Sequence, residues 1–131
     1  MAPTPGWKFI EGHLLGEGVE FVGLINRLGR FIDCSAKDKI NLSPEQMEMF
    51  SMMVSLGLSM QRDYDDKLGA VQYTVTERKN SKIVTVPISS GSVIVVTNKK
   101  SNVPDLAKKI LKAVDHIKGL DSKMLGQEIT A

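Results

Sequence analysis

The sequence predicts an α+β domain in which helices cover a single β-sheet. Segments of helical period and segments that alternate every second residue follow in the order helix, two strands, helix, three strands, helix. The chain has 131 residues, of which 42% are hydrophobic, as is typical of one globular domain of ordinary size. We therefore expect a single domain over 1–131, with a core at about 7–118, a loose N-terminus at 1–6 and a tail at 119–131.

The first third of the chain predicts a helix followed by a β-hairpin. Apolar residues recur at helical spacing over 7–14, which indicates a short amphipathic helix. Residues 20–26 are nearly continuous in apolar side chains and predict a strand. A turn at 27–29 leads to a second strand at 30–34, whose short alternating pattern suits the edge of a sheet.

The longest helical segment runs from Ser43 to Gly69 and contains five of the seven methionines of the chain. Ser43 and Gln46 are spaced for a capping box, and Pro44 suits the first helical position. Gly69 is placed to end the helix in a left-handed conformation. The apolar surface covers roughly 240°, whereas a helix needs little more than ~100° to cover its own core. We therefore expect two apolar neighbours, its own sheet and a partner; loops of the same chain are the alternative.

Two apolar stripes run along this helix, with a polar arc in the remaining angle. The longer stripe consists of Met49, Met53, Leu56 and Met60, the shorter one of Met47, Phe50, Val54 and Leu58, and the polar arc of Glu48, Ser51, Ser55, Ser59 and Arg62. We expect the longer stripe to cover the sheet and the shorter stripe to meet the partner; the reverse assignment is the alternative. Gly57 lies between the stripes and would permit close approach of a partner helix.

Three strands and a last helix are expected after the long helix. Residues 70–78 alternate with period two, and their polar face and charged end suit an edge strand. Residues 83–88 predict the fourth strand. The fifth, at 92–97, holds four consecutive β-branched apolar residues, so we place it at the centre of the sheet, buried on both faces. A final amphipathic helix is expected to begin at 102–105 and to end at Gly119.

The local motifs have a recognisable order. An apolar strand at 22–26, a turn with Gly29 and a second apolar strand precede the long helix. A strand with a proline at 83–88, the run at 93–96 and an amphipathic helix follow it. This order resembles the roadblock family of dynein light chains and its bacterial and archaeal relatives. Leu28 departs from the family, whose members more often have an acidic residue there, while 62–69 resembles small archaeal members.

The resemblance implies a five-stranded antiparallel sheet of order 2-1-5-4-3, a roadblock/longin/profilin-like fold. The long helix would lie on one face and the N- and C-terminal helices on the other. It also implies a homodimer built from the long helix and the third strand of each subunit. We expect the dimer interface to comprise Met47, Phe50, Val54, Gly57, Leu58, Tyr73 and Val75. Members of the family are scaffolds and regulators of small GTPases and are not enzymes.

The sequence contains no arrangement that predicts catalysis. His13 and His116 have no cysteine, serine or carboxylate at motif spacing, so we interpret both as surface or boundary histidines. Cys34 lacks the signature of a nucleophile and is interpreted as a half-buried structural thiol. The glycines at 16–18 lack the third glycine of a dinucleotide fingerprint. Residues 89–92 could offer amides to an anion but are interpreted as a turn. We expect no enzymatic activity, no metal and no cofactor.

Three aspartates, Asp63, Asp65 and Asp66, lie at the C-terminal end of the long helix. The negative end of the helix dipole disfavours carboxylates there. Their spacing does not fit an EF-hand loop. We expect this acidic segment to bind a partner of opposite charge; a bound cation and a solvated helix end are the alternatives.

Charge and composition narrow the class of partner. The formal charge of +2 is near balance and makes a nucleic-acid partner unexpected. The lysines of the last helix are interpreted as its solvated face, with contact to an anionic membrane or RNA as the alternative. One cysteine fits a reducing cytoplasm, and no run of 18 apolar residues indicates a membrane span.

We therefore predict a cytoplasmic homodimeric scaffold or regulator that binds another protein. A small GTPase is the class of partner that the family resemblance implies. The alternative is a small-molecule sensor of profilin- or PAS-like fold, with a ligand held between sheet and helix. The apolar stripes offer few convergent polar groups for such a ligand, which favours the scaffold.

Overall fold

The computed structural model describes residues 6–16, 18–37 and 40–115 of the chain. Several sequence-based expectations fall outside these ranges. They are the conformation of residues 1–5, the tail at 119–131, the end of the last helix at Gly119 and the environment of His116.

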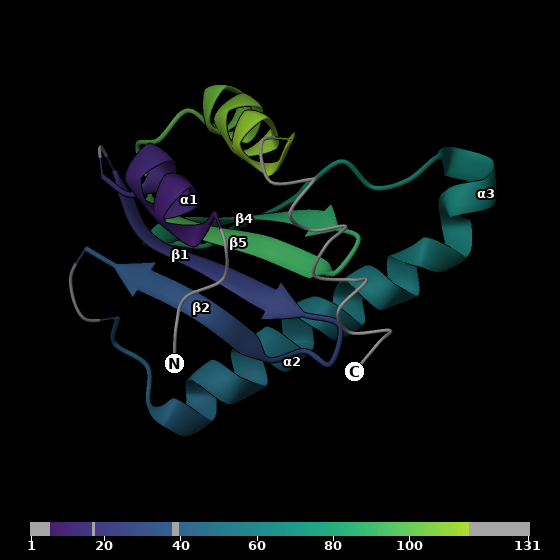
Figure 1. Ribbon diagram of the computed structural model, residues 1–131, viewed down its shortest axis with the longest axis horizontal. Helices are drawn as coiled ribbons and strands as arrows, with labels where there is room; N and C mark the ends of the chain where they lie inside the picture. Colours follow the sequence, from purple (N-terminus) through teal and green to yellow (C-terminus); the bar gives the residue numbers. More distant parts are fainter. Residues whose placement is uncertain (1–5, 17, 38–39, 116–131) are drawn as a thin grey trace.

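Five antiparallel strands form one sheet of order β2-β1-β5-β4-β3 (Figure 1), which confirms the predicted topology. The strands are β1 (Val19–Asn26), β2 (Phe31–Ala36), β3 (Thr74–Glu77), β4 (Ser81–Ile88) and β5 (Gly91–Asn98). The central strand is β5, as its apolar run predicted, and the side chains of Val93 and Val95 are buried. An edge position for 30–34 and for 70–78 is also confirmed, since β2 and β3 end the sheet.

The strand β3 is shorter than predicted, because only the second half of 70–78 pairs with β4. The ladder ends where Thr74 lies opposite Thr85. Two residues farther along β4 comes Pro87, which has no amide hydrogen to donate to a neighbouring strand. Tyr73 and the three residues before it therefore form a connection rather than a strand.

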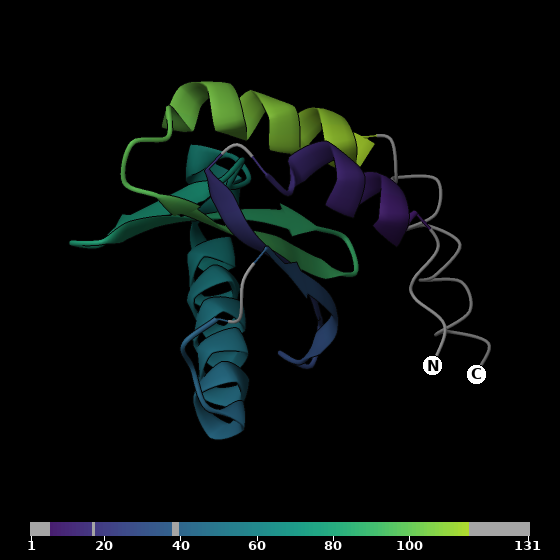
Figure 2. The ribbon, with the colours of Figure 1, turned by 90° about the vertical axis from the view of Figure 1, so that its left-hand side faces the viewer.

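Helices cover both faces of the sheet (Figure 2). The helix α1 (Trp7–Leu14) and the helical residues 103–115 lie on one face, and α2 (Pro44–Gln61) lies on the other, as predicted. The first face holds the larger apolar cluster, in which Ile10 and Ile110 from the two helices are fully buried. The second cluster, beneath α2, has Phe21, Ile25 and Ile94 as its buried centre.

The predicted beginning of the long helix is confirmed, whereas the single helix expected up to Gly69 is interrupted, because α2 ends at Gln61. The Ser43 hydroxyl accepts a hydrogen bond from the Gln46 amide at 3.1 Å, and the Gln46 side chain accepts one from the Ser43 amide at 2.9 Å. This capping box satisfies amides at the helix N-terminus that no helical carbonyl reaches. Beyond α2 the chain continues through η1 (Arg62–Tyr64) and α3 (Asp65–Leu68) to Gly69, whose φ is 82°. Figure 1 shows α3 standing away from the sheet.

Candidate docking surface on helix α2 and strand β3

The two stripes of α2 are placed in the reverse of the expected way. Met47, Phe50 and Val54 are half-buried on the cluster of Phe21, Ile25 and Ile94, and Leu58 is buried. The expectation that the longer stripe covers the sheet is therefore wrong. Its four members, Met49, Met53, Leu56 and Met60, are 59–68% exposed.

A buried serine explains why the shorter stripe of α2, and not the longer one, faces the sheet. Ser51, from the arc that was expected to face water, is 1% exposed. Its hydroxyl donates a hydrogen bond of 2.7 Å to the carbonyl oxygen of Gly29, in the turn between β1 and β2. A Cβ atom added at Gly29 would lie 3.3 Å from the Cβ of Ser55, so the helix and the turn approach closely. The side of α2 that carries Ser51 and Ser55 therefore packs against this turn, and the side that carries the methionines of the longer stripe is exposed to solvent.

The outer face of the helix is a continuous apolar surface, which we call the Met face. Its members are Met49, Met52, Met53, Leu56, Met60 and Tyr64, each more than half exposed. Single exposed apolar residues are ordinary, but a continuous patch on a small protein marks a surface that binds another molecule. Methionine suits such a surface because its flexible thioether adapts to different partners.

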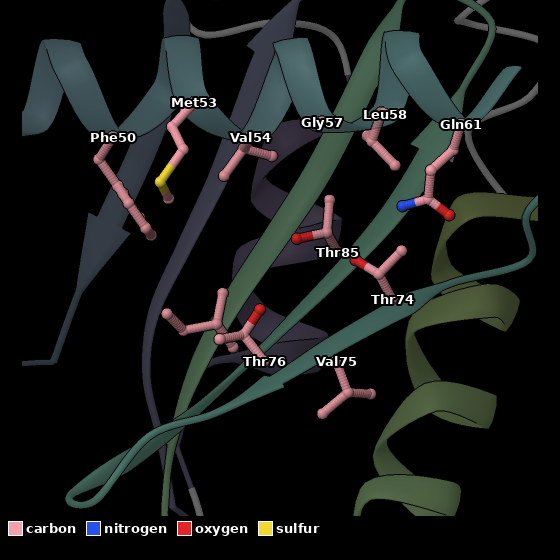
Figure 3. Close-up of a pocket in the computed structure, with 11 residues that line it drawn as sticks. Phe50, Met53, Val54, Gly57, Leu58, Gln61, Thr74, Val75, Thr76 and Thr85 are labelled. Carbon is pink, nitrogen blue, oxygen red and sulfur yellow. The ribbon is translucent and has the colours of Figure 1, made fainter. Parts of the chain in front are cut away.

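A groove of about 360 Å³ separates α2 from strands β3 and β4 (Figure 3). Phe50, Val54 and Leu58 line its helical side. On the strand side, Thr74 lies opposite Thr85 in the ladder, and both point towards the helix in Figure 3. The groove therefore combines apolar walls with hydroxyl groups on its floor. Met53 lines the groove and also belongs to the Met face, so the two surfaces are continuous.

Strand β3 forms the outer border of this groove and has a free edge. Within the described residues it pairs with β4 alone, and its other edge has no strand beside it. Val75 lies opposite Val84, on the face away from α2, and is 41% exposed. An unpaired edge with exposed apolar side chains is a surface to which another strand can add.

Most of the predicted dimer-interface residues meet at this groove. Phe50, Val54, Gly57 and Leu58 line its helical side, and Val75 lies at its outer border on β3 with its side chain directed away from α2. Met47 lies farther along α2 against the sheet, and Tyr73 is exposed just before β3. Their role in an interface stays a prediction.

The acidic segment lies on η1 and α3, beyond the end of α2. Asp63 and Asp66 are exposed. Asp65 is half-buried, and its Oδ1 atom has no hydrogen-bond partner among the described residues. The segment therefore adds negative charge close to Tyr64 at one end of the Met face.

The remaining candidate residues lie apart from this surface. His13 is exposed and stacks on Phe9, with ring centroids 5.3 Å apart. The Cys34 side chain on the edge strand β2 is exposed, more so than the half-buried structural thiol that was expected, although part of its sulfur is still covered. The reason is the alternation of β2, where the side chains at 32, 34 and 36 are exposed and those at 31, 33 and 35 are half-buried. Partial burial of the sulfur, together with the nearby Asp33 carboxylate, nevertheless raises the pKa of the Cys34 thiol.

The described ranges hold neither a candidate metal site nor a helix that could span a membrane. No three histidine, cysteine, aspartate or glutamate side chains in 6–16, 18–37 and 40–115 gather where a metal ion could sit. None of the helices described there combines the length and the apolar character that crossing a membrane requires. Residues 89–90 form the turn between β4 and β5, as expected.

Comparison with known sequences assigns the family. The sequence model of a family of unknown function, DUF6659, matches residues 10–126. The chain belongs to the DUF6659 family. None of the curated proteins matches this DUF6659 chain in sequence.

Solved structures show that the DUF6659 chain has a roadblock-like fold. Gliding protein MglB from Thermus thermophilus superposes with a TM-score of 0.75 and 12% identity, covering 94% of this chain and 93% of that one. The Roadblock/LC7 domain from Streptomyces avermitilis has a TM-score of 0.63 and 14% identity, covering 78% and 84%. Profilin II from Acanthamoeba castellanii has a TM-score of 0.59 and 16% identity, covering 86% and 95%. At such low identities the similarity establishes the fold alone.

The sequence did not indicate that the Met face would be the exposed side of α2. One signal in the sequence could have indicated it. Serines at 51, 55 and 59 recur every four residues and form a row of small side chains along the helix. A row of small residues permits close packing, so the side that carries it is a candidate for the buried side despite its polarity.

Proposed function

We propose that this DUF6659 protein is a non-enzymatic, homodimeric scaffold or regulator in the cytoplasm that acts by binding another protein. The observation that carries the proposal is the continuous apolar surface formed by the Met face and the groove beside the free edge of β3. A small GTPase is the proposed class of partner, on the strength of the resemblance to the roadblock family. We further propose that residues 1–131 form one domain similar to small archaeal members of the roadblock family.

The proposed dimer has two-fold symmetry, with the same surface used by both copies. The β3 edges of the two subunits pair and continue the sheet across the interface. Pairing there brings the two α2 helices together along the side that carries Met53 and Gly57, which line the groove. MglB, which has the same fold, has been solved in a tetrameric arrangement, and this supports self-association of the fold.

A charged substitution on the Met face tests the dimer. Leu56 is 63% exposed, so Leu56→Glu is expected to leave the fold intact and to convert the dimer into a monomer in analytical ultracentrifugation. Leu28→Glu is the matched control, because Leu28 is 80% exposed in the turn between β1 and β2. A dimer that persists in Leu56→Glu, or a wild-type chain that is monomeric at 100 µM, would contradict the proposal.

Phe50→Glu is a useful second variant, because it is expected to change the stability of the chain, whereas Leu56→Glu is expected to change its association. The Phe50 ring is half-buried on the cluster beneath α2. A carboxylate there must lose solvation without a partner, which costs several kcal/mol. We therefore expect Phe50→Glu to lower the urea midpoint strongly, whereas Leu56→Glu changes mainly the association.

The acidic segment is proposed to steer a partner with a basic surface. In the symmetric dimer its three aspartates occur twice. Charges at the rim of an interface accelerate encounter more than they strengthen binding. Replacing all three aspartates with asparagine is expected to leave unfolding unchanged and to slow association with the partner. The association rate, measured at low and at physiological salt, should differ most at low salt, since ions screen exposed charges. A rate that the substitutions do not alter would remove this role.

A small-molecule sensor remains the second candidate, and the groove is the observation that favours it. Its volume of about 360 Å³ falls at the lower end of the roughly 300–1,000 Å³ of ligand pockets. Native mass spectrometry of protein purified from its source cell separates the two candidates. A bound metabolite without a protein partner would favour the sensor, and a co-purified protein would favour the scaffold.

A further inference from the structure

A second and smaller cavity lies near the end of α2, where the helix passes the β1–β2 and β4–β5 turns. Its volume is about 70 Å³. Arg27, Arg62, Ser55, Ser59, Ser92 and Leu58 line it. Neither arginine lines the groove beside β3, so this cavity is a separate site on the chain.

The cavity is lined by two arginines and by no carboxylate. Arg27 donates a hydrogen bond of 2.9 Å from Nε to the carbonyl oxygen of Ser89, which fixes the guanidinium against the β4–β5 turn. The Arg62 side chain makes no hydrogen bond or salt bridge with a residue of the described ranges. Both arginines are exposed, so the positive charge of the lining is open to an anion from the solvent.

The hydroxyl groups of the lining complete a set of donors suited to an oxyanion. A guanidinium offers several N–H donors in a planar fork that matches the geometry of a phosphate. Each serine of the lining adds an O–H group that is able to donate. The volume is several times the ~10–15 Å³ that one water needs, and far below the ~300 Å³ at which pockets for whole ligands begin. One phosphoryl group fits these limits, and a nucleoside does not.

The C-terminal end of α2 lies at this cavity, and hydrogen bonding of its last carbonyl groups reduces the unfavourable dipole there. A helix C-terminus is unfavourable for anions because its last carbonyl groups lack amide partners. At the end of α2, however, the Arg62 amide hydrogen-bonds to the carbonyl oxygens of Leu58 and Ser59. The backbone keeps right-handed helical angles at Gln61 and Arg62 and continues into η1, so α2 does not end in a full turn of bare carbonyl groups at the cavity.

We infer that this cavity binds a single phosphoryl group, held by the guanidinium groups of Arg27 and Arg62. The group comes either from free phosphate or from a phosphorylated serine side chain, since both present the same tetrahedral oxyanion. The inference does not depend on the proposed dimer, because Leu58 is the one residue that the cavity shares with the groove.

Isothermal titration with inorganic phosphate, against sodium chloride of equal ionic strength, tests the site. We expect saturable binding of phosphate at a stoichiometry of one per chain, weakened at least five-fold by Arg27→Gln and by Arg62→Gln. Arg30→Gln is the matched control, since Arg30 is exposed in the same turn as Arg27 and does not line the cavity. Circular dichroism confirms folding, and Arg62→Gln keeps the test valid if loss of the Arg27 bond to Ser89 disturbs the turn.

A second titration with capped phosphoserine distinguishes the two sources. Tighter binding of inorganic phosphate indicates a free phosphate, and equal or tighter binding of the capped amino acid indicates a modified side chain; both outcomes support the site. The inference is overturned if phosphate binds no better than chloride. It is also overturned if Arg30→Gln weakens phosphate binding as much as the two cavity variants do.

Discussion

Alanine at Gly57 separates the stability of the single chain from its association. Gly57 lies in the interior of α2, and a Cβ atom built there meets no atom within 4 Å. Alanine in a helix interior is more favourable than glycine by about 1 kcal/mol. For a domain of this size, 1 kcal/mol raises the melting temperature by roughly 2–8 °C. Within one chain, Gly57→Ala is therefore expected to stabilise the fold.

The same methyl group is expected to weaken the dimer. If a partner helix approaches along the groove, as we propose, the open space above Gly57 is filled in the assembly. An added methyl group in a filled contact costs about 1–3 kcal/mol. Since 1.4 kcal/mol corresponds to a factor of ten, the dissociation constant should rise at least about five-fold.

Two measurements and one control variant make this test decisive. Chain stability is measured by urea unfolding in the Leu56→Glu background, where the dimer is expected to be absent, and association by ultracentrifugation in the wild-type background. Gly12→Ala is the control, because Gly12 is helical in α1 and equally has no atom within 4 Å of its Cβ position. If both alanine variants raise the unfolding free energy and neither changes the dissociation constant, no helix approaches Gly57.

Two further predictions concern the sheet and its exposed thiol. Gly91 has a φ of 152°, and a Cβ atom there would lie 1.8 Å from the carbonyl oxygen of Ile25. Gly91→Ala is therefore expected to lower the free energy of unfolding, measured by urea titration, by about 3 kcal/mol or more. A decrease of less than about 0.5 kcal/mol would contradict this expectation. Because the pKa of Cys34 is raised, less thiolate is present at a given pH, so iodoacetamide should label the native chain at pH 8 more slowly than the urea-unfolded chain. Asp33→Asn removes the carboxylate that, together with burial, raises the pKa of Cys34, so it should increase the labelling rate of the native chain. An unchanged rate would exclude this carboxylate as a cause of the raised pKa.

The order of elements and the central place of the fifth strand could be predicted because local patterns determine them, whereas the full strand order 2-1-5-4-3 was an implication of the resemblance to the roadblock family. The β-branched run at 93–96 identified the central strand before any pairing was known. Ser43 and Gln46 identified the beginning of the long helix through hydrogen bonds between near neighbours. Such signals depend on residues within a few positions of one another, so they survive without knowledge of the fold.

The orientation of α2 could not be predicted in the same way. Its two apolar stripes are similar in composition, so periodicity alone does not say which one is buried. The choice depends on the bond between Ser51 and Gly29, which are 22 residues apart in the sequence. The arginine cavity is equally non-local, because Arg27 and Arg62 line one space only after α2 has packed beside the β1–β2 turn.

The two sides of the sheet are unequally built, and this has a thermodynamic consequence. The cluster beneath α1 and residues 103–115 contains fourteen buried residues among those described, whereas the cluster beneath α2 contains three. A layer with few buried contacts opens at a lower free energy than the rest of the domain. Anything that binds α2 in its closed position therefore stabilises the least stable layer of the protein, and the gain grows with the concentration of the binder. Amide exchange in α2 should accordingly depend on protein concentration, whereas exchange in β5 should report the global unfolding of the chain.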